Sequence, residues 1–436
     1  MLACRRPPRR TDRPKSVDVR SVASVQSNNS TEGSHWTSNI FKAGLPKRHD
    51  SLNNRMPVEM TTRHDKDQLP PTLSNQFEDP QEIEWNAFLL KLIETRQQNG
   101  EDVRGGEMIG ASHFGREGSE GRKKLEHLTR LVIGGIPMKL RHPLWMELSN
   151  TQAIMKPDAY GDYLNSRADN DGTELDAILK DVPRTLTTKY DFYSGKGFKR
   201  LKEVLVAFVA RYPHLGYTQG LNTIAGYLLL TIPSEEDAFW VLCNIVENYF
   251  PADYFSRVDA MKSPLADNTL LRAFVKELLP QVNDHLDRLN IPSEYTVPIR
   301  WFFTAFSNTL PESAAMRLWD VWLCLPNQKT FLFAFALALI CQNTDGILAC
   351  EDDGAYFSFL DGKLKLPEQP EEITESLKLA FRIGRKVEHV AARRAEVRDS
   401  MRLENRLRRR RTQSLEVLVD REEGSNDAPT DEVNAA

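Results

Sequence analysis

Cysteine is scarce in this sequence, long apolar runs are absent, and the common phosphate- and metal-binding motifs are missing. The five cysteines are scattered over 436 residues without a C-x-x-C pair, which predicts a reducing compartment and no structural zinc. The longest apolar run, Phe331 to Cys341, is too short to span a bilayer, so we expect a buried core helix there. The N-terminus is rich in Arg and Pro and lacks the apolar segment of a secretory signal. These absences predict a cytoplasmic protein without a transmembrane segment.

Motifs for hydrolysis and nucleotide binding are also absent. The seven glycines between Gly100 and Gly121 predict a flexible surface loop, because the Gly-Lys-Ser/Thr ending of a phosphate-binding loop does not follow them. The sequence contains no G-x-S-x-G turn and no H-E-x-x-H helix. A formal net charge of only −4 gives no indication of nucleic-acid binding. We therefore expect neither a metal site nor a nucleic-acid partner.

Charge and composition divide the chain into five predicted segments. Residues 1–20 hold seven Lys or Arg and residues 393–411 hold nine Arg, whereas 416–436 is acidic. Such blocks are usually solvated, and some bind acidic membranes, so the basic tails are candidates for peripheral membrane association. The segments are a disordered basic and Ser-rich tail over 1–78, a helix with a Gly-rich loop over 79–121, a folded domain over 122–350, an acidic loop with a basic helix over 351–412, and a disordered acidic tail over 413–436.

The fold class is predicted to be all-α. Apolar residues recur at spacings of three and four over 81–98 and 198–210, as on the buried face of a helix. Further helical patterns cover about 264–289, 296–309, 312–325, 329–343 and 371–411. Alternating β-branched runs bounded by turn residues are nearly absent, which argues against a sheet.

Two polar residues near the two ends of the stretch 178–222 are the candidate functional pair. Arg184 follows Pro183, which is expected to close the preceding helical run. Gln219 precedes Gly220, which allows a backbone to approach closely. An arginine can stabilise the charge of a phosphoryl-transfer transition state, and a glutamine amide can orient the attacking water. Taken alone, however, a surface arginine and a turn amide are the more common interpretation.

Arg141 and Trp145 form a second conspicuous pair. They are four residues apart and therefore share one face of the helix that Pro137 is expected to open. We interpret them as a structural pair that holds helices together, in preference to a direct contact with a ligand.

Several motifs arrive in the order found in one protein family. The stretch of about 130 to 345 resembles the TBC domain of Rab GTPase-activating proteins. The residues that carry the resemblance are Gly135-Ile136-Pro137 with Arg141 and Trp145, the I-x-x-D-x-x-R pattern of Ile178, Asp181 and Arg184, the Y-x-Q-G pattern of Tyr217 to Gly220 with Asn222, and the later Pro298, Trp301, Phe306 and Arg317-Leu318-Trp319-Asp320.

This resemblance implies a two-lobed helical TBC domain over 122–350 that activates a partner GTPase and is not itself an enzyme. Arg184 and Gln219 would be catalytic fingers inserted into the nucleotide site of a GTP-bound Rab-family small GTPase. Asp181 would hold the arginine's loop, and Tyr217, Gly220 and Asn222 would shape the glutamine's loop.

The resemblance also implies that the chain needs no cofactor of its own, because the partner carries GTP and Mg²⁺. It implies a role in vesicle traffic, with recruitment from the cytoplasm to endomembranes. No family motif lies outside about 78–390, so that fragment is expected to keep activity in solution.

Two alternatives remain open from the sequence. One is a Rab-binding scaffold that does not stimulate hydrolysis, although such a module has no need of both Arg184 and Gln219. The other is a helical repeat scaffold, against which the lack of a fixed internal period counts.

Overall fold

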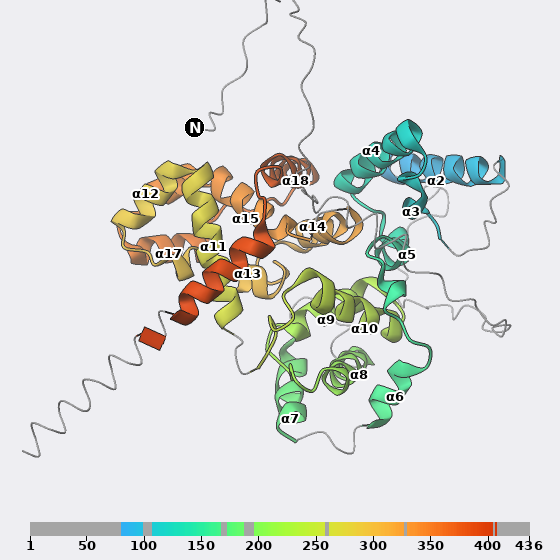
Figure 1. Cartoon of the computed structure of the whole chain (residues 1–436), viewed down its shortest axis with the longest axis horizontal. Helices are drawn as coiled ribbons and strands as arrows, with labels where there is room; N and C mark the ends of the chain where they lie inside the picture. Colours follow the sequence, from blue (N-terminus) through green and yellow to red (C-terminus); the bar gives the residue numbers. More distant parts are fainter. Residues whose placement is uncertain are drawn as a thin grey trace, which may run out of the picture.

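The computed structural model describes residues 80–98, 107–166, 172–186, 196–257, 261–326, 329–403 and 406–407. Throughout these ranges the regular elements are helices and no β-strand forms (Figure 1), which confirms the all-α prediction. No helix within them is long and apolar enough to cross a membrane. The tails predicted to be disordered over 1–78 and 413–436 lie outside the described residues.

Three helices begin the described part of the chain, and the first two pack on the third. They are α2 (Pro80–Gln98), the short α3 (Ala111–Phe114) and α4 (Gly118–Gly134). The indole of Trp85 on α2 is fully buried and donates a hydrogen bond of 2.9 Å to the carbonyl of Gly135, just after α4. The helix predicted over 81–98 is thereby confirmed.

The Gly-rich stretch over 100–121 differs from the predicted flexible loop. Its described part contains α3 and the start of α4, and the turn before α3 is anchored by one carboxylate. Glu147 accepts the backbone N–H groups of Met108, Ile109 and Gly110 at 2.5–3.1 Å. Burial raises the pKa of Glu147, and these hydrogen bonds oppose that shift. The sequence could not show this anchor because Glu147 lies on a different helix.

The N-terminal lobe is built around α8. Its elements are α5 (Met138–Leu148), η2 (Thr151–Ala153), α6 (Ala159–Asn165), α7 (Gly172–Asp181), η4 (Val182–Arg184), α8 (Lys196–Arg211), α9 (Leu221–Thr231), α10 (Glu235–Asn244) and η6 (Ile245–Tyr249). The apolar face of α8 carries Leu201, Val204, Leu205 and Phe208, all fully buried, which confirms the predicted helix. Helices α6, α7, α9 and α10 surround it.

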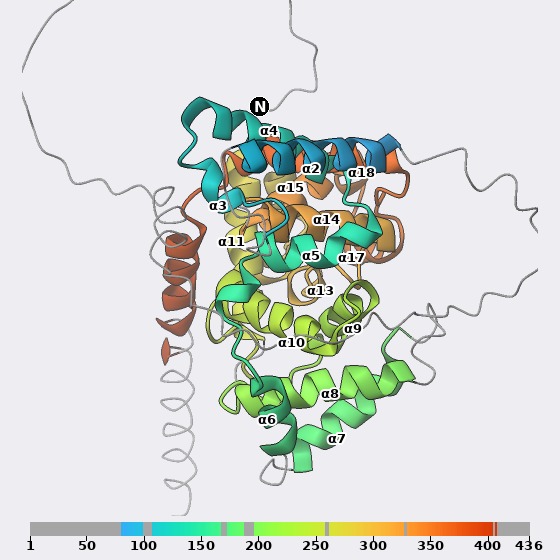
Figure 2. The same ribbon diagram turned by 90° about the vertical axis from the view of Figure 1, so that its right-hand side faces the viewer.

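The C-terminal lobe is built around α15, which is buried from Phe331 to Ile340 as the sequence predicted. Its elements are α11 (Lys262–Leu278), α12 (Pro280–Arg288), η7 (Ser293–Tyr295), α13 (Arg300–Phe303), α14 (Glu312–Cys324), α15 (Phe331–Gln342), α16 (Thr344–Leu348), α17 (Asp353–Gly362) and α18 (Pro370–Gly384), followed by a helix over 390–403. Figure 2 shows α6, α7 and α8 in one lobe and α11, α15 and α18 in the other.

Two helices expected in the C-terminal lobe are interrupted. The helix expected over 264–289 breaks at Leu279, because Pro280 has no N–H for a continuing helix and starts α12 instead. The helix expected over 296–309 is reduced to α13, since Ala305 and Phe306 adopt φ values of +46° and +65°.

The segment over 351–412 differs from the expected acidic loop, whereas the expected basic helix does form, over 390–403, separated from the preceding α18 (Pro370–Gly384) by residues 385–389. Its acidic start forms α17, where the Asp352 side chain caps the helix by accepting the N–H of Ala355 at 2.7 Å. Then α18, which a capping box of Gln369 and Glu372 opens, packs on α15. The acidic residues therefore begin helices here, because their side chains accept the free N–H groups of the first turn.

Candidate functional site

Arg184 lies at the end of a 3₁₀ turn directly after α7. Helix α7 ends at Asp181, as expected from Pro183, which occupies the first turn of the following η4, where its missing N–H needs no partner. The Arg184 side chain is 61% exposed, and one of its guanidinium nitrogens, Nη2, is paired with Oδ1 of Asp181, three residues earlier. The arginine is therefore solvent-facing, and its guanidinium is held by an acidic partner.

Asp181 links this turn to the segment that precedes Gln219. Its side chain is buried, and its second oxygen, Oδ2, accepts the phenolic hydroxyl of Tyr217 at 2.7 Å. Burial, followed by the hydrogen bond to Asp181, raises the pKa of Tyr217. The tyrosine therefore stays protonated and keeps donating to the carboxylate that also holds Arg184.

A second buried link runs through Thr185 and Asn222. The Thr185 hydroxyl donates to the backbone carbonyl of Asp181 at 2.7 Å and accepts from Nδ2 of Asn222 at 2.8 Å. The Oδ1 atom of Asn222 in turn accepts the backbone N–H of Gly220 at 2.8 Å. These bonds tie the turn of Arg184 to both sides of Gln219, because Tyr217 precedes it and Gly220 follows it.

Gln219 itself is exposed between two buried neighbours. Thr218 donates its hydroxyl to the carbonyl of Phe255 at 2.7 Å. Gly220 has φ +112°, and a Cβ atom there would lie 2.8 Å from the ring of Phe303, so only glycine fits without strain. Within the described part of the chain no hydrogen bond occupies the Gln219 amide. The loop is held firmly while its glutamine side chain faces solvent.

A further brace acts on the backbone of Tyr217. Its N–H donates to Oε2 of Glu174 at 2.6 Å, and the other oxygen of Glu174 pairs with Arg257 at 2.6 Å. The sequence motifs did not single out Glu174, Thr185 or Arg257. Of these three, Thr185 was the easiest to suspect from the sequence, because it directly follows the candidate arginine.

Arg141 and Trp145 lie away from these loops. Both donate to Asp320 on α14, the guanidinium at 3.1–3.2 Å and the indole at 2.9 Å, and the N–H of Ile136 adds a further bond at 3.2 Å. Asp320 is fully buried, which raises its pKa, while the charge of Arg141 opposes that shift. The geometry is that of a brace between α5 and α14, in agreement with the structural interpretation of the pair.

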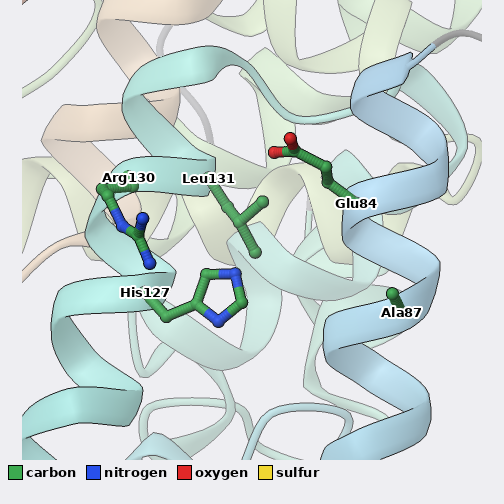
Figure 3. Close-up of a pocket in the computed structure, with 5 residues that line it drawn as sticks. All are labelled: Glu84, Ala87, His127, Arg130 and Leu131. Atoms are coloured by element: carbon green, nitrogen blue, oxygen red, sulfur yellow. The ribbon is translucent and has the colours of Figure 1, made fainter.

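A surface pocket of about 360 Å³ lies elsewhere, between α2 and α4 (Figure 3). Glu84 and Ala87 line it from α2, and His127, Arg130 and Leu131 line it from α4. Burial lowers the pKa of His127, and the charge of Arg130 lowers it further. None of these residues belongs to the loops of Arg184 and Gln219, so this pocket is not the candidate site.

Fold and sequence together define the class of protein. Residues 138–348 match the Rab-GTPase-TBC domain family, in which the motifs around Arg184 and Gln219 fall. Residues 138–348 of the chain are therefore a Rab-GTPase-TBC domain, which confirms the resemblance indicated by its motifs.

Named relatives support this assignment. A TBC domain-containing protein of Schizosaccharomyces pombe is 33% identical over 301 residues, which cover 69% of this chain and 38% of that protein. Human small G protein signaling modulator 3 is 29% identical over 270 residues, which cover 61% of this chain and 35% of that protein. This chain thus spans well under half the length of these relatives.

Two solved structures share the fold. The TBC domain of a Chlamydomonas flagellar RabGAP superposes with a TM-score of 0.51 at 21% identity, covering 69% of this chain and 96% of that domain. The Ypt/Rab-GAP domain of Gyp1p gives a TM-score of 0.50 at 19% identity, covering 59% and 92%. These matches confirm the two-lobed helical architecture.

Proposed function

We propose that this protein accelerates GTP hydrolysis by a Rab-family small GTPase, with Arg184 and Gln219 acting on the nucleotide of the GTP-bound partner. The observation that carries the proposal is that both side chains are exposed while their loops are joined by buried hydrogen bonds. Such an arrangement fixes the backbones that carry two exposed polar groups, which suits groups that must stabilise a transition state.

Arg184 would neutralise the charge that develops on the phosphate oxygens. Its planar guanidinium can bind two oxygens at once, which an ammonium cannot. To reach the partner it must leave Asp181. Tyr217 keeps donating to the other oxygen of Asp181, so the buried carboxylate retains a hydrogen bond when the arginine departs.

Gln219 would orient the attacking water. Its amide offers both a donor and an acceptor, and its backbone is fixed through Thr218 and Gly220 on either side. Because the partner would carry GTP and Mg²⁺, this chain needs only to supply positioned groups. On the same proposal it works in vesicle traffic from the cytoplasm, with its basic tails assisting recruitment to endomembranes.

A Rab-binding scaffold without catalysis is the alternative. The observation that favours it is the Arg184–Asp181 pair, in which the guanidinium is already occupied. Single-turnover GTP hydrolysis by a panel of Rab GTPases separates the two functions, because a scaffold binds without raising the rate.

The deciding variant is Arg184→Ala. We expect the stimulated rate to fall by about 10³–10⁵, which corresponds to roughly 4–7 kcal/mol of barrier. Arg184→Lys should not restore it. Lys123→Ala is the control, because Lys123 is 72% exposed and also pairs with an acid three residues earlier, Glu120, on α4. Stimulation that survives Arg184→Ala, or a wild-type chain that stimulates no Rab, refutes the proposal.

The role of Gln219 is tested on a partner whose own catalytic glutamine is changed to leucine. If Gln219 supplies the amide, the wild-type chain should stimulate the leucine partner only modestly less than the normal partner. The Gln219→Ala variant should not stimulate the leucine partner at all. Complete loss of stimulation on the leucine partner, with little effect of Gln219→Ala on the normal partner, would show that Gln219 only shapes the turn.

A further inference from the structure

The basic helix over 390–403 is bound to the domain by three arginines that pair with acids on other elements (the red helix beside α11 in Figure 2). Arg393 pairs with Glu277 and Arg394 with Asp267, both on α11. The third, Arg398, pairs with Asp253, which lies in the segment 251–257 between η6 and α11. One of the three contacts therefore reaches a non-helical segment.

The Arg398–Asp253 contact is partly shielded from solvent. The side chains are 20% and 43% exposed, respectively. The Arg398 guanidinium lowers the pKa of Asp253, against the smaller effect of burial. Asp253 therefore stays charged and paired at neutral pH.

The residues that follow Asp253 support both neighbours of Gln219. The carbonyl of Phe255 accepts the Thr218 hydroxyl at 2.7 Å. The ring of Phe255 lies 5.6 Å from the ring of Phe303, and that second ring fills the space in which a Cβ of Gly220 would stand.

The same segment also contacts the start of the glutamine loop. The N–H of Arg257 donates to the carbonyl of Leu215 at 2.8 Å, and its guanidinium pairs with Glu174, which accepts the N–H of Tyr217. The segment 253–257 is thus connected to the loop by two direct hydrogen bonds and, through Phe303 and Glu174, by two indirect contacts, and it is connected to the C-terminal helix at Arg398.

We propose that Arg398 is a positioning residue, which holds Asp253 and through residues 253–255 keeps the Gln219 loop in its working position. The inference rests on the proposed function, in which Gln219 orients water, and it adds a residue about 180 positions away in the sequence. Without Arg398 the segment loses its ion pair with the C-terminal helix. A displacement of about 1 Å at a positioned group can reduce a rate by about 10².

Arg393 provides a matched control on the same helix. Its side chain is 26% exposed and its partner Glu277 is 51% exposed, close to the values for Arg398 and Asp253. It pairs with α11 rather than with the segment 251–257. A general loosening of the helix should therefore affect both arginine variants, whereas the proposed path affects Arg398 alone.

The first test is amide hydrogen exchange on the full chain, which needs no GTPase. The N–H groups of Tyr217 and Gly220 are held by Glu174 and Asn222, and we expect Arg398→Ala to speed their exchange by about tenfold or more while Arg393→Ala does not. Equal exchange in the wild-type chain and in Arg398→Ala overturns the inference. If Arg398→Ala does not fold, Asp253→Asn breaks the same pair from the other side and must give the same result.

The second test is a double-mutant cycle in stimulated hydrolysis. Arg398→Ala should lower the saturated rate about tenfold, with little change in the concentration of half-saturation, and should add almost nothing in a Gln219→Ala background. Multiplicative losses in the double variant refute action through Gln219. A wild-type chain that stimulates no Rab refutes the proposed function, whereas the exchange result still decides whether Arg398 holds the loop.

Discussion

The buried pair of Arg394 and Asp267 is expected to be a large single contribution to stability. Asp267 is 1% exposed and accepts two hydrogen bonds from the guanidinium, at 2.6 and 3.0 Å. Arg394→Ala would leave a carboxylate in the interior without its cation, and breaking a buried pair in this way costs about 3–5 kcal/mol. For a domain of this size, that loss corresponds to roughly 5–8 °C in Tm.

The stability lost in Arg394→Ala should depend on pH, and the direction of this dependence follows from the pKa of Asp267. Burial raises the pKa of Asp267, and the charge of Arg394 opposes the shift, so the variant's Asp267 has a pKa further above the unfolded value of about 3.9. An acid with a raised folded pKa binds more protons when folded, so stability falls as pH rises between the two pKa values. The deficit of Arg394→Ala relative to the wild-type chain should therefore be larger at about pH 8 than at about pH 5.

Urea unfolding at both pH values measures this deficit. Asp267→Asn in the Arg394→Ala background is the diagnostic control, because it removes the stranded charge and should recover part of the lost stability. A deficit below about 1 kcal/mol, or a double variant no more stable than Arg394→Ala alone, would refute the reasoning.

Two further predictions follow from the structure. Gly220→Ala should destabilise the protein by about 2–4 kcal/mol in urea unfolding and depress stimulated hydrolysis, because a Cβ would strain a positive φ and meet Phe303. Gly362→Ala is the control: a Cβ there meets nothing within 4 Å, so the change should be neutral or slightly stabilising. The structure revises the expectation that residues 78–390 suffice for activity: a chain truncated after Lys386 lacks the helix over 390–403, so it should unfold at lower urea concentration and stimulate hydrolysis less than the full chain. Equal stability and activity would show that this helix is accessory.

The sequence predicted the helices well where apolar periodicity was strong. The patterns over 81–98, 198–210 and 329–343 correspond to α2, α8 and α15. The prediction from sequence was wrong where a contact between residues distant in the sequence overrides the local sequence pattern. The Gly-rich stretch near Gly110 is ordered by Glu147, and the turn at Ala305 and Phe306 adopts positive φ values that composition does not indicate.

For the candidate site, the motifs located the two exposed side chains but not their supports. Asp181 and Tyr217 are 36 residues apart, and Thr185 and Asn222 are 37 residues apart, yet each pair is in direct contact. No spacing rule connects positions on two separate turns, because their contact depends on how α7 and α9 pack around α8. From the sequence, supporting roles for Asp181, Tyr217 and Asn222 were indicated only by their positions within the family's motifs.

The folded unit extends beyond the residues that match the TBC family, which end at 348. After that point α18 buries Ile373, Leu377 and Ala380 as it packs on α15, so a chain ending at 348 would expose apolar surface of the core helix. The helix over 390–403 then neutralises Asp267, which is buried on α11. Phe303 and the segment 251–257 contact the Gln219 loop, so we expect order in the C-terminal lobe to influence a candidate catalytic group in the N-terminal lobe. The residues proposed to act on GTP therefore lie within the matched TBC region, whereas the folded unit that supports them extends beyond residue 348.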